Sequence, residues 1–267
     1  MSLIYGQAST VVVWLGESFD GSDLAIDVLE HYEENNGLHL DPLILPSLVI
    51  ETSHGYVEIN TSIRKLLRVP WWQRLWTVQE FVLAQQVVFQ CGKRLLKLDT
   101  LKKFEASFVK HLTSCCKRVR YENNMDRLWY CFETVATLIE TITTRKTPAD
   151  FGLLQFMSQF RNRESADPRD KVYGLLGLAF GEEVGFVEPD YTLSYEEVLQ
   201  ATVIASVNRT GTLQFLSHVY GPRDRHLPSF LPDWSMPIPD TDFHLDRRVL
   251  VSRYYPAKKD ESSYNAS

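Results

Sequence analysis

The chain has 267 residues, of which 44% are hydrophobic and 12% aromatic, and its formal net charge is -6. This length and apolar content can bury a sizeable core in one large domain or two modest ones. The acidic balance gives no general attraction to nucleic acid or anionic lipid, so neither is expected as a partner. The sequence shows no apolar run long enough for a membrane-spanning helix and no export signal, which predicts a cytoplasmic location.

Two apolar runs near the start of the chain predict strands. The run from Val11 to Leu15 is almost entirely β-branched or apolar and stops at Gly16, as in a strand buried on both faces of a parallel sheet. The second run, from Val87 to Cys91, also ends at a glycine. Helical spacing at Asp23–Glu34 and Ile59–Leu67 lies between them and implies helical crossovers. We therefore predict an α/β fold in which the two strands pair in parallel.

The region between these strands contains two further segments of interest. Residues 37–56 have no clear period and are expected to form a loop or insertion. Pro70 then fits the first turn of a short helix that carries three tryptophans and Glu80. Because Trp76 and Glu80 are four residues apart, they should share a helix face, where an apolar wall can raise a carboxylate pKa or grip a ring-shaped ligand. Glu80 is therefore the first functional candidate. The alternative, favoured by spacing alone, makes the tryptophans core and pairs Glu80 with Arg74 or a neighbouring cation at the domain surface.

The second half of the chain is predicted to be mainly α-helical. Helices are expected at Leu101–Cys115, Asn124–Thr144, Gly152–Phe160, Pro168–Leu178 and Ser194–Val207. Asp167 should cap the fourth of these, and Ser194 with Glu197 forms a capping box at the start of the fifth. The charges of residues 167–171 could face a ligand or partner, but capping and surface roles account for them equally and are favoured. The polar, tyrosine-rich residues 241–267 are expected to be disordered.

Several specific catalytic and metal motifs are missing from the sequence. It has no glycine-rich phosphate loop, no His-Glu-x-x-His helix and no Gly-x-Ser-x-Gly elbow. The seven histidines are scattered without a metal-binding pair, so no metal is assigned. The four cysteines have neither Cys-x-x-Cys spacing nor the density of a secreted disulfide scaffold, which fits a reducing cytosol. For the adjacent pair Cys115-Cys116, a packing role is favoured over a redox role.

Taken together and in order, these segments resemble the fungal heterokaryon incompatibility (HET) domain family. The matching pieces are Ile4-Tyr5 through Ala8 to Trp14-Leu15-Gly16, Pro70-Trp71 with Arg74, Trp76, Gln79 and Glu80, then Ala84 and Cys91-Gly92, followed by Asp167 to Tyr173, Leu175 to Leu178, Pro189-Asp190-Tyr191 and Leu231 to Ser235. The resemblance implies a partial HET α/β domain at residues 1–97, a helical HET-associated region at 98–240 and a tail at 241–267.

The resemblance implies a role in fungal non-self recognition and programmed cell death, through assembly with other HET or signalling proteins or with itself. The family is distantly similar to Toll/interleukin-1 receptor (TIR) domains, which implies a partial TIR-like or flavodoxin-like parallel sheet. Some TIR domains hydrolyse NAD with a glutamate four residues after a tryptophan. An alternative function is therefore an NAD glycohydrolase, with NAD as substrate, Glu80 as catalytic residue and Trp76 as pocket wall.

The family's domain opens with two strands that have no counterpart before Val11, so we expect an N-terminally truncated form of the domain. This expectation places assembly ahead of NAD hydrolysis. It also leaves a third alternative, an inactive fragment. An unpaired strand edge beside Val11 to Leu15 would favour association.

Overall fold

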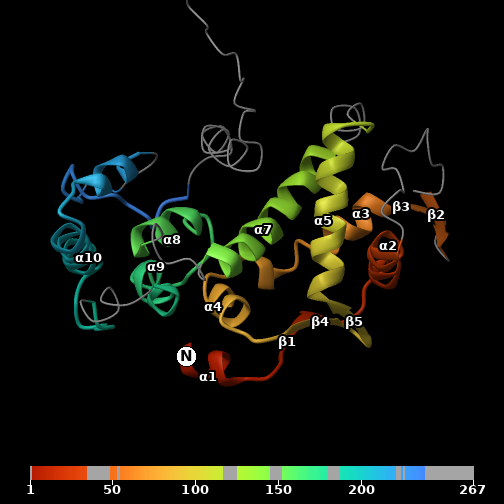
Figure 1. Cartoon of the computed structure of the whole chain (residues 1–267), viewed down its shortest axis with the longest axis horizontal. Coiled ribbons are helices and arrows are strands. Elements are labelled where there is room, and N and C mark those ends of the chain that lie inside the picture. The colour runs from red at the N-terminus through yellow and green to blue at the C-terminus, as the bar shows by residue number, and fades with distance from the viewer. Residues whose placement is uncertain are drawn as a thin grey trace, which may run out of the picture.

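A computed structural model describes residues 2–34, 49–52, 55–116, 125–144, 152–179, 187–220, 224 and 226–237 (Figure 1). The expected tail at 241–267 lies outside these residues. A three-stranded sheet has the order β1-β4-β5, with β1 at Val11–Gly16, β4 at Val87–Cys91 and β5 at Arg94–Lys97. The other described parts are mostly helical, so the predicted α/β class is confirmed at this level.

The predicted parallel pairing of β1 with β4 is confirmed, with Val11 opposite Val87 and Val13 opposite Phe89. The sequence prediction missed β5, which pairs antiparallel with β4 and makes the sheet mixed. The chain turns between β4 and β5 at Gly92, whose φ is +54°. A Cβ at this position would lie 2.8 Å from Cβ of Ser18, so both the turn and the close packing favour glycine.

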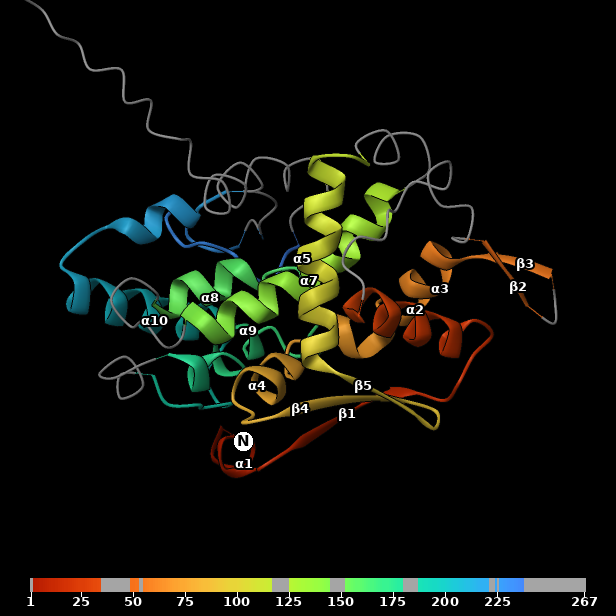
Figure 2. The ribbon, with the colours of Figure 1, turned by 45° about the vertical axis from the view of Figure 1, so that its right-hand side comes forward.

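The sheet is covered by helices on one face, as Figure 2 shows for α2, α4 and α5. Along β1, Val13 and Leu15 are buried, whereas Val12 is 58% exposed and Trp14 is 48% exposed. The expectation that β1 is buried on both faces is therefore wrong. An apolar run shows that a strand suits a sheet, but it does not show whether a second helical layer covers the sheet.

The helices begin and end close to the predicted positions in most places. The α-helices are α1 (Ser2–Gln7), α2 (Ser22–Glu34), α3 (Ile59–Leu66), α4 (Thr77–Val82), α5 (Leu98–Thr113), α7 (Met125–Thr144), α8 (Leu153–Gln159), α9 (Asp170–Tyr173) and α10 (Tyr195–Thr210); short 3-10 helices are η2 (Pro70–Gln73), η3 (Leu176–Leu178) and η5 (Gln214–His218). The predicted capping box is confirmed, because the Ser194 hydroxyl accepts from the Glu197 backbone N–H and the Glu197 carboxylate accepts from the Ser194 N–H. Among the described residues, no helix has the length and apolar character needed to cross a membrane.

Two predicted segments differ from the structure. Part of the expected loop at 37–56 belongs to an antiparallel hairpin of β2 (Val49–Thr52) and β3 (Gly55–Glu58), while most of the rest lies outside the described residues. The expected helix from Pro168 to Leu178 is broken into α9 and η3. The break falls at Gly174, where a Cβ would lie 2.8 Å from the Asp170 carbonyl oxygen and 3.2 Å from Cδ2 of Leu75. Close packing against Leu75 therefore takes precedence over helix continuation.

The core is rich in aromatic contacts between elements that are distant in sequence. Phe104 and Phe108 of α5 pack on Phe132 of α7, each with ring centroids 4.9 Å from that of Phe132. On the sheet, the ring of Trp72 stacks on that of Phe89 of β4, with centroids 5.2 Å apart. The first set of contacts joins α5 to α7, and the second joins the tryptophan segment to the sheet.

Candidate functional site

The tryptophan segment is two short helices rather than the single predicted helix. Residues 70–73 form η2, with Pro70 in its first turn, and α4 begins only at Thr77. Between them Arg74 is extended, with φ -76° and ψ 139°. Two backbone hydrogen bonds with Glu164 hold this extended turn. The Leu75 N–H donates to the Glu164 carbonyl at 2.9 Å, and the Glu164 N–H donates to the Gln73 carbonyl at 2.7 Å. A partner 90 positions away therefore breaks a helix that local spacing predicts.

Trp71 and Trp72 are buried core residues. Their rings meet edge to face with centroids 4.9 Å apart, and the Trp72 indole N–H donates to the Leu66 carbonyl at 3.1 Å. Such pairs add specific aromatic geometry to a large buried apolar area. The alternative that the tryptophans are core residues is therefore confirmed for Trp71 and Trp72.

Glu80 is partly buried and contacts Trp71 rather than an open pocket. The Trp71 indole N–H donates to Oε2 of Glu80 at 3.4 Å. Burial, the negative charge of Glu80 and a hydrogen bond to Glu80 together raise the pKa of Tyr5 on α1. No ion pair joins Glu80 to Arg74 in the part of the chain that the structure describes. Glu80 thus connects α1 to α4, and the expected pairing with Arg74 is wrong.

Trp76 turns its polar edge toward the helical region instead of toward Glu80. Its indole N–H donates to Oδ2 of Asp170 at 3.1 Å, and the Tyr191 hydroxyl donates to Oδ1 of the same carboxylate at 2.7 Å. Beside them, the Gln79 amide donates to the Gly174 carbonyl at 2.7 Å. We call Trp76, Asp170 and Tyr191 the Asp170 cluster. It joins three of the segments that the sequence singled out separately.

Two buried cations support this junction. The Lys171 ammonium donates to the carbonyls of Arg161 and Arg163. Burial, with a smaller contribution from the nearby charge of Arg161, lowers the pKa of Lys171 to about 8. Burial also lowers the pKa of Arg163 to about 9, and its guanidinium donates to the Arg74 carbonyl at 3.2 Å. Within residues 167–171, Lys171 is thus buried on backbone carbonyls and Asp170 is buried on Trp76 and Tyr191, so a surface role is wrong for both.

The exposed side of the sheet is a second candidate. It consists of Val12, Trp14, Val88, Gln90, Leu95 and Lys97, which the strand registers place in two rows across β1, β4 and β5, and we call it the outer sheet face. Trp14, Gln90 and Leu95 form one row, in which Leu95 is 55% exposed. Large exposed apolar side chains gathered in this way mark surfaces that bind other molecules.

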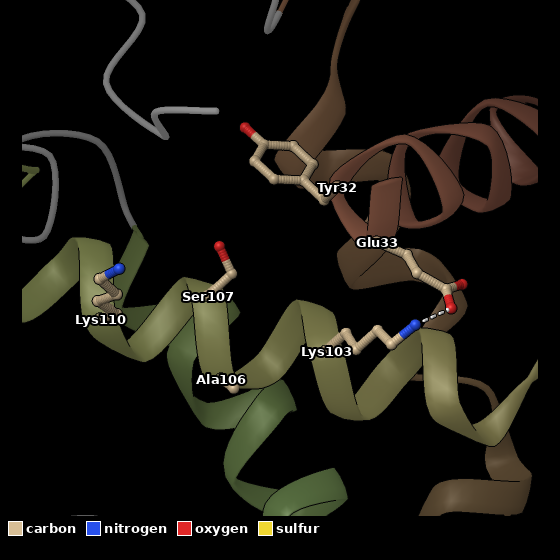
Figure 3. A pocket seen from close by; sticks show the side chains of 6 residues that line it. All are labelled: Tyr32, Glu33, Lys103, Ala106, Ser107 and Lys110. Atoms are coloured by element: carbon tan, nitrogen blue, oxygen red, sulfur yellow. Dashed lines mark hydrogen bonds and ion pairs between the residues drawn. The ribbon is translucent and has the colours of Figure 1, made fainter. Parts of the chain in front are cut away.

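A hollow of about 400 Å³ lies between α2 and α5. Figure 3 shows the side chains of Tyr32 (α2) and Ser107 (α5) on the same side of α5, and the ion pair of Glu33 with Lys103 at the other end of the hollow. The Glu33–Lys103 distance is 2.7 Å, and this ion pair lowers the pKa of Glu33. The residues that line the hollow include neither Glu80 nor Trp76. The two predicted site residues therefore do not belong to it.

Sequence reasoning also missed a cluster at the end of α5. His111, Cys115 and Cys116 bring their ring nitrogen and sulfur atoms within 4.8 Å of one another. The available signal was the four-residue spacing from His111 to Cys115. This mixed set contains neither a histidine pair nor Cys-x-x-Cys spacing.

Comparisons with known proteins agree with the resemblance in the sequence. Residues 1–80 match the family model described as "Heterokaryon incompatibility protein (HET)". The chain is 27% identical over 280 residues to "Heterokaryon incompatibility protein 6, OR allele" of Neurospora crassa. That alignment covers 87% of this chain and 41% of the relative, so the chain spans less than half the relative's length. No solved structure matches the chain.

Proposed function

We propose that the chain is a heterokaryon incompatibility (HET) domain protein that acts in fungal non-self recognition and programmed cell-death signalling by assembling with a second copy of itself. The observation that carries the assembly step is the outer sheet face. On β1 this face presents Val12 and Trp14, both about half exposed. A contact that buries them would remove a large apolar area from water.

The position of β1 makes a second copy the favoured partner. β1 lies at one edge of the sheet, and no described strand pairs with its other side. The sequence of β1, Val-Val-Val-Trp-Leu-Gly, contains no charged residue and no proline. Natural edge strands usually carry such residues to prevent pairing with another chain. An unguarded apolar edge is therefore suited to strand addition.

Two copies can meet at this edge about a two-fold axis. The same patch then serves both partners, which is the commonest arrangement in protein dimers. Antiparallel pairing of the two β1 strands would join the sheets and place the two outer faces side by side. Hydrogen bonds of the backbone would supply affinity, and Val12 with Trp14 would supply apolar contact.

The test is the oligomeric state of the purified chain by sedimentation velocity over a wide concentration range. We expect concentration-dependent dimers, which Trp14→Lys should abolish because it places a charge on the shared face. The matched control is Ile204→Lys on α10, which changes another apolar residue that is 58% exposed. Expression of the three forms in a filamentous fungus should show cell death for the wild type and the control only. A chain that stays monomeric throughout would refute assembly with a second copy.

We also propose how the chain is divided into a sheet region and a helical region. Parallel pairing of β1 with β4 and the helices between them support a partial TIR-like sheet at residues 1–97, followed by a helical region at 98–240. The alternative of NAD hydrolysis gains no support from the described residues. The Trp71 indole N–H donates to Glu80, whereas the Trp76 indole N–H donates to Asp170.

A further inference from the structure

The end of α5 brings three side chains with metal-binding atoms together. The turn after Thr113 folds the chain back, because the backbone N–H of Cys116 donates to the His111 carbonyl at 2.8 Å. Nδ1 of His111 then lies 3.1 Å from Sγ of Cys115 and 3.9 Å from Sγ of Cys116. The two sulfur atoms are 3.8 Å apart. The three atoms therefore form a small triangle at the helix end.

We propose that His111, Cys115 and Cys116 bind one zinc ion, with a fourth coordination position left open. Around tetrahedral zinc, two sulfur ligands are about 3.8 Å apart, and a sulfur and a nitrogen are about 3.6 Å apart, as follows from the usual bond lengths. The observed sulfur pair matches this spacing. Each nitrogen–sulfur distance needs a change of only a few tenths of an ångström, and the thiols lose their protons when the ion binds.

The chemistry of the donors selects the class of ion. Two thiolates and an imidazole suit zinc, whereas magnesium and calcium require oxygen ligands. A disulfide between Cys115 and Cys116 is the competing use of the two sulfurs. Adjacent Cα atoms are only about 3.8 Å apart, below the usual disulfide range of about 4.4–6.8 Å, so this bond would be strained. One ion can take both sulfurs without that strain.

The surroundings of the cluster also favour a cation. The Ser114 hydroxyl donates to the Lys110 carbonyl at 2.6 Å, which holds the turn that carries Cys115 against the end of α5. The site lies at the C-terminus of the 16-residue helix α5, where the helix dipole is negative. His111 and Cys116 are buried, but Cys115 is exposed, so an ion can enter from the Cys115 side.

A bound ion would lie at the end of α5, close to the hollow between α2 and α5. Tyr32 lines that hollow, and burial together with the negative charge of Cys116 raises the pKa of Tyr32. Metal binding to Cys116 would therefore fix a residue that lies beside the wall of the hollow. The role that follows is structural, because the ion would tie Cys115 and Cys116 to His111 and so fix the turn that ends α5.

The experiment is a titration of the reduced, untagged 267-residue chain with Co²⁺ as a spectroscopic probe and then with Zn²⁺. We expect one equivalent of Co²⁺ to produce sulfur-to-cobalt charge-transfer absorption and one equivalent of Zn²⁺ to displace it. Zinc should also raise the melting temperature, because a ligand that binds the folded state stabilises it. His111→Gln, Cys115→Ser and Cys116→Ala should each weaken binding at least tenfold.

The matched control is Cys91→Ala, which removes a buried thiol from β4 and leaves the cluster intact. It should bind zinc like the wild type. Circular dichroism of every variant separates loss of binding from loss of folding, and Cys115→Ser is the most informative because Cys115 is exposed. Absent charge-transfer absorption, or zinc affinity unchanged in folded Cys115→Ser, would overturn the proposal. A disulfide between the two cysteines in the chain purified under reducing conditions would overturn it as well.

Discussion

Replacing Asp170 with alanine tests whether the Asp170 cluster holds the two halves of the chain together. The carboxylate is 8% exposed and accepts hydrogen bonds from Trp76 at 3.1 Å and Tyr191 at 2.7 Å. A hydrogen bond to a charged group contributes about 1.5–3 kcal/mol to stability. Tyr191 is about half exposed, so water can replace part of its bond and its share falls to about 1 kcal/mol. With about 2 kcal/mol from Trp76, we expect Asp170→Ala to lower the unfolding free energy by about 3 kcal/mol.

The assay is unfolding in urea, followed by tryptophan fluorescence and circular dichroism. With an m-value of about 3 kcal/mol/M for a chain of this size, the midpoint should fall by about 1 M. Tyr191→Phe removes only the hydroxyl and completes a double-mutant cycle with Asp170→Ala. We expect a coupling energy of about 1 kcal/mol, because the second change should cost little once its partner is gone.

The matched control is Asp99→Ala. Asp99 is an exposed aspartate whose ion pair with Lys102 is 3.5 Å long, and such surface pairs contribute less than about 1 kcal/mol. Its loss should barely move the midpoint. A coupling energy between Asp170 and Tyr191 within the roughly 0.5 kcal/mol scatter of independent sites would refute the reasoning. The junction would then depend on apolar packing alone.

Lys171, Asp167 and Glu80 each provide a further test. Burial lowers the pKa of Lys171 to about 8, below its unfolded value of about 10.4, so the unfolded chain holds the extra proton between these values and stability should rise with pH from about 8 to 10. Lys171→Met should show a smaller rise in urea unfolding at each pH, and the part that remains above pH 9 is expected from Arg163, whose pKa burial lowers to about 9. The predicted N-cap role of Asp167 is wrong, because α9 begins at Asp170 and its N-cap is Arg169. The Asp167 carboxylate instead accepts the Arg169 N–H at 2.9 Å and pairs with the Arg169 guanidinium at 2.6 Å. Asp167→Ala should therefore cost about 1 kcal/mol in thermal melts, and Asp167→Asn less, because asparagine keeps the oxygen that accepts the N–H. Glu80→Gln should leave the fold intact, and neither it nor the wild type should release nicotinamide from NAD; Glu80-dependent release, measured by chromatography, would make the enzyme interpretation primary.

The sequence predicted those parts of the fold that depend on local pattern. The apolar runs of β1 and β4 and the helices between them were enough to predict parallel pairing, because a helical crossover leaves little choice of direction. The capping box at Ser194 was predictable for the same reason, since its two hydrogen bonds lie within one turn. By contrast, the hairpin of β5 depends on a turn at Gly92 that the pattern of β4 alone does not reveal.

The candidate site was less predictable because its partners are distant in sequence. The spacing of Trp76 and Glu80 indicates a shared helix face, but it does not show which groups cover that face. The structure places Asp170 beside Trp76, and Trp71 beside Glu80, across an extended residue that no helical pattern anticipates. The same limit applies to Asp170 itself. Its charge predicts exposure, and only the tryptophan and tyrosine that reach it explain its burial.

The residues that make the family resemblance recognisable here are largely those that join distant segments. Trp76 and Gln79 bind the segment around Asp170 and Gly174, and the Pro-Asp-Trp-Ser motif is joined to α10 where the Tyr195 hydroxyl donates to Oδ1 of Asp233 at 3.3 Å. Buried polar contacts of this kind tolerate few substitutions, because losing one partner leaves the other unpaired. A motif can therefore be specific for the fold without marking a catalytic centre. On this argument, surfaces for partners should be sought among residues that remain exposed, and the outer sheet face is such a surface because Val12, Trp14 and Leu95 are all about half exposed.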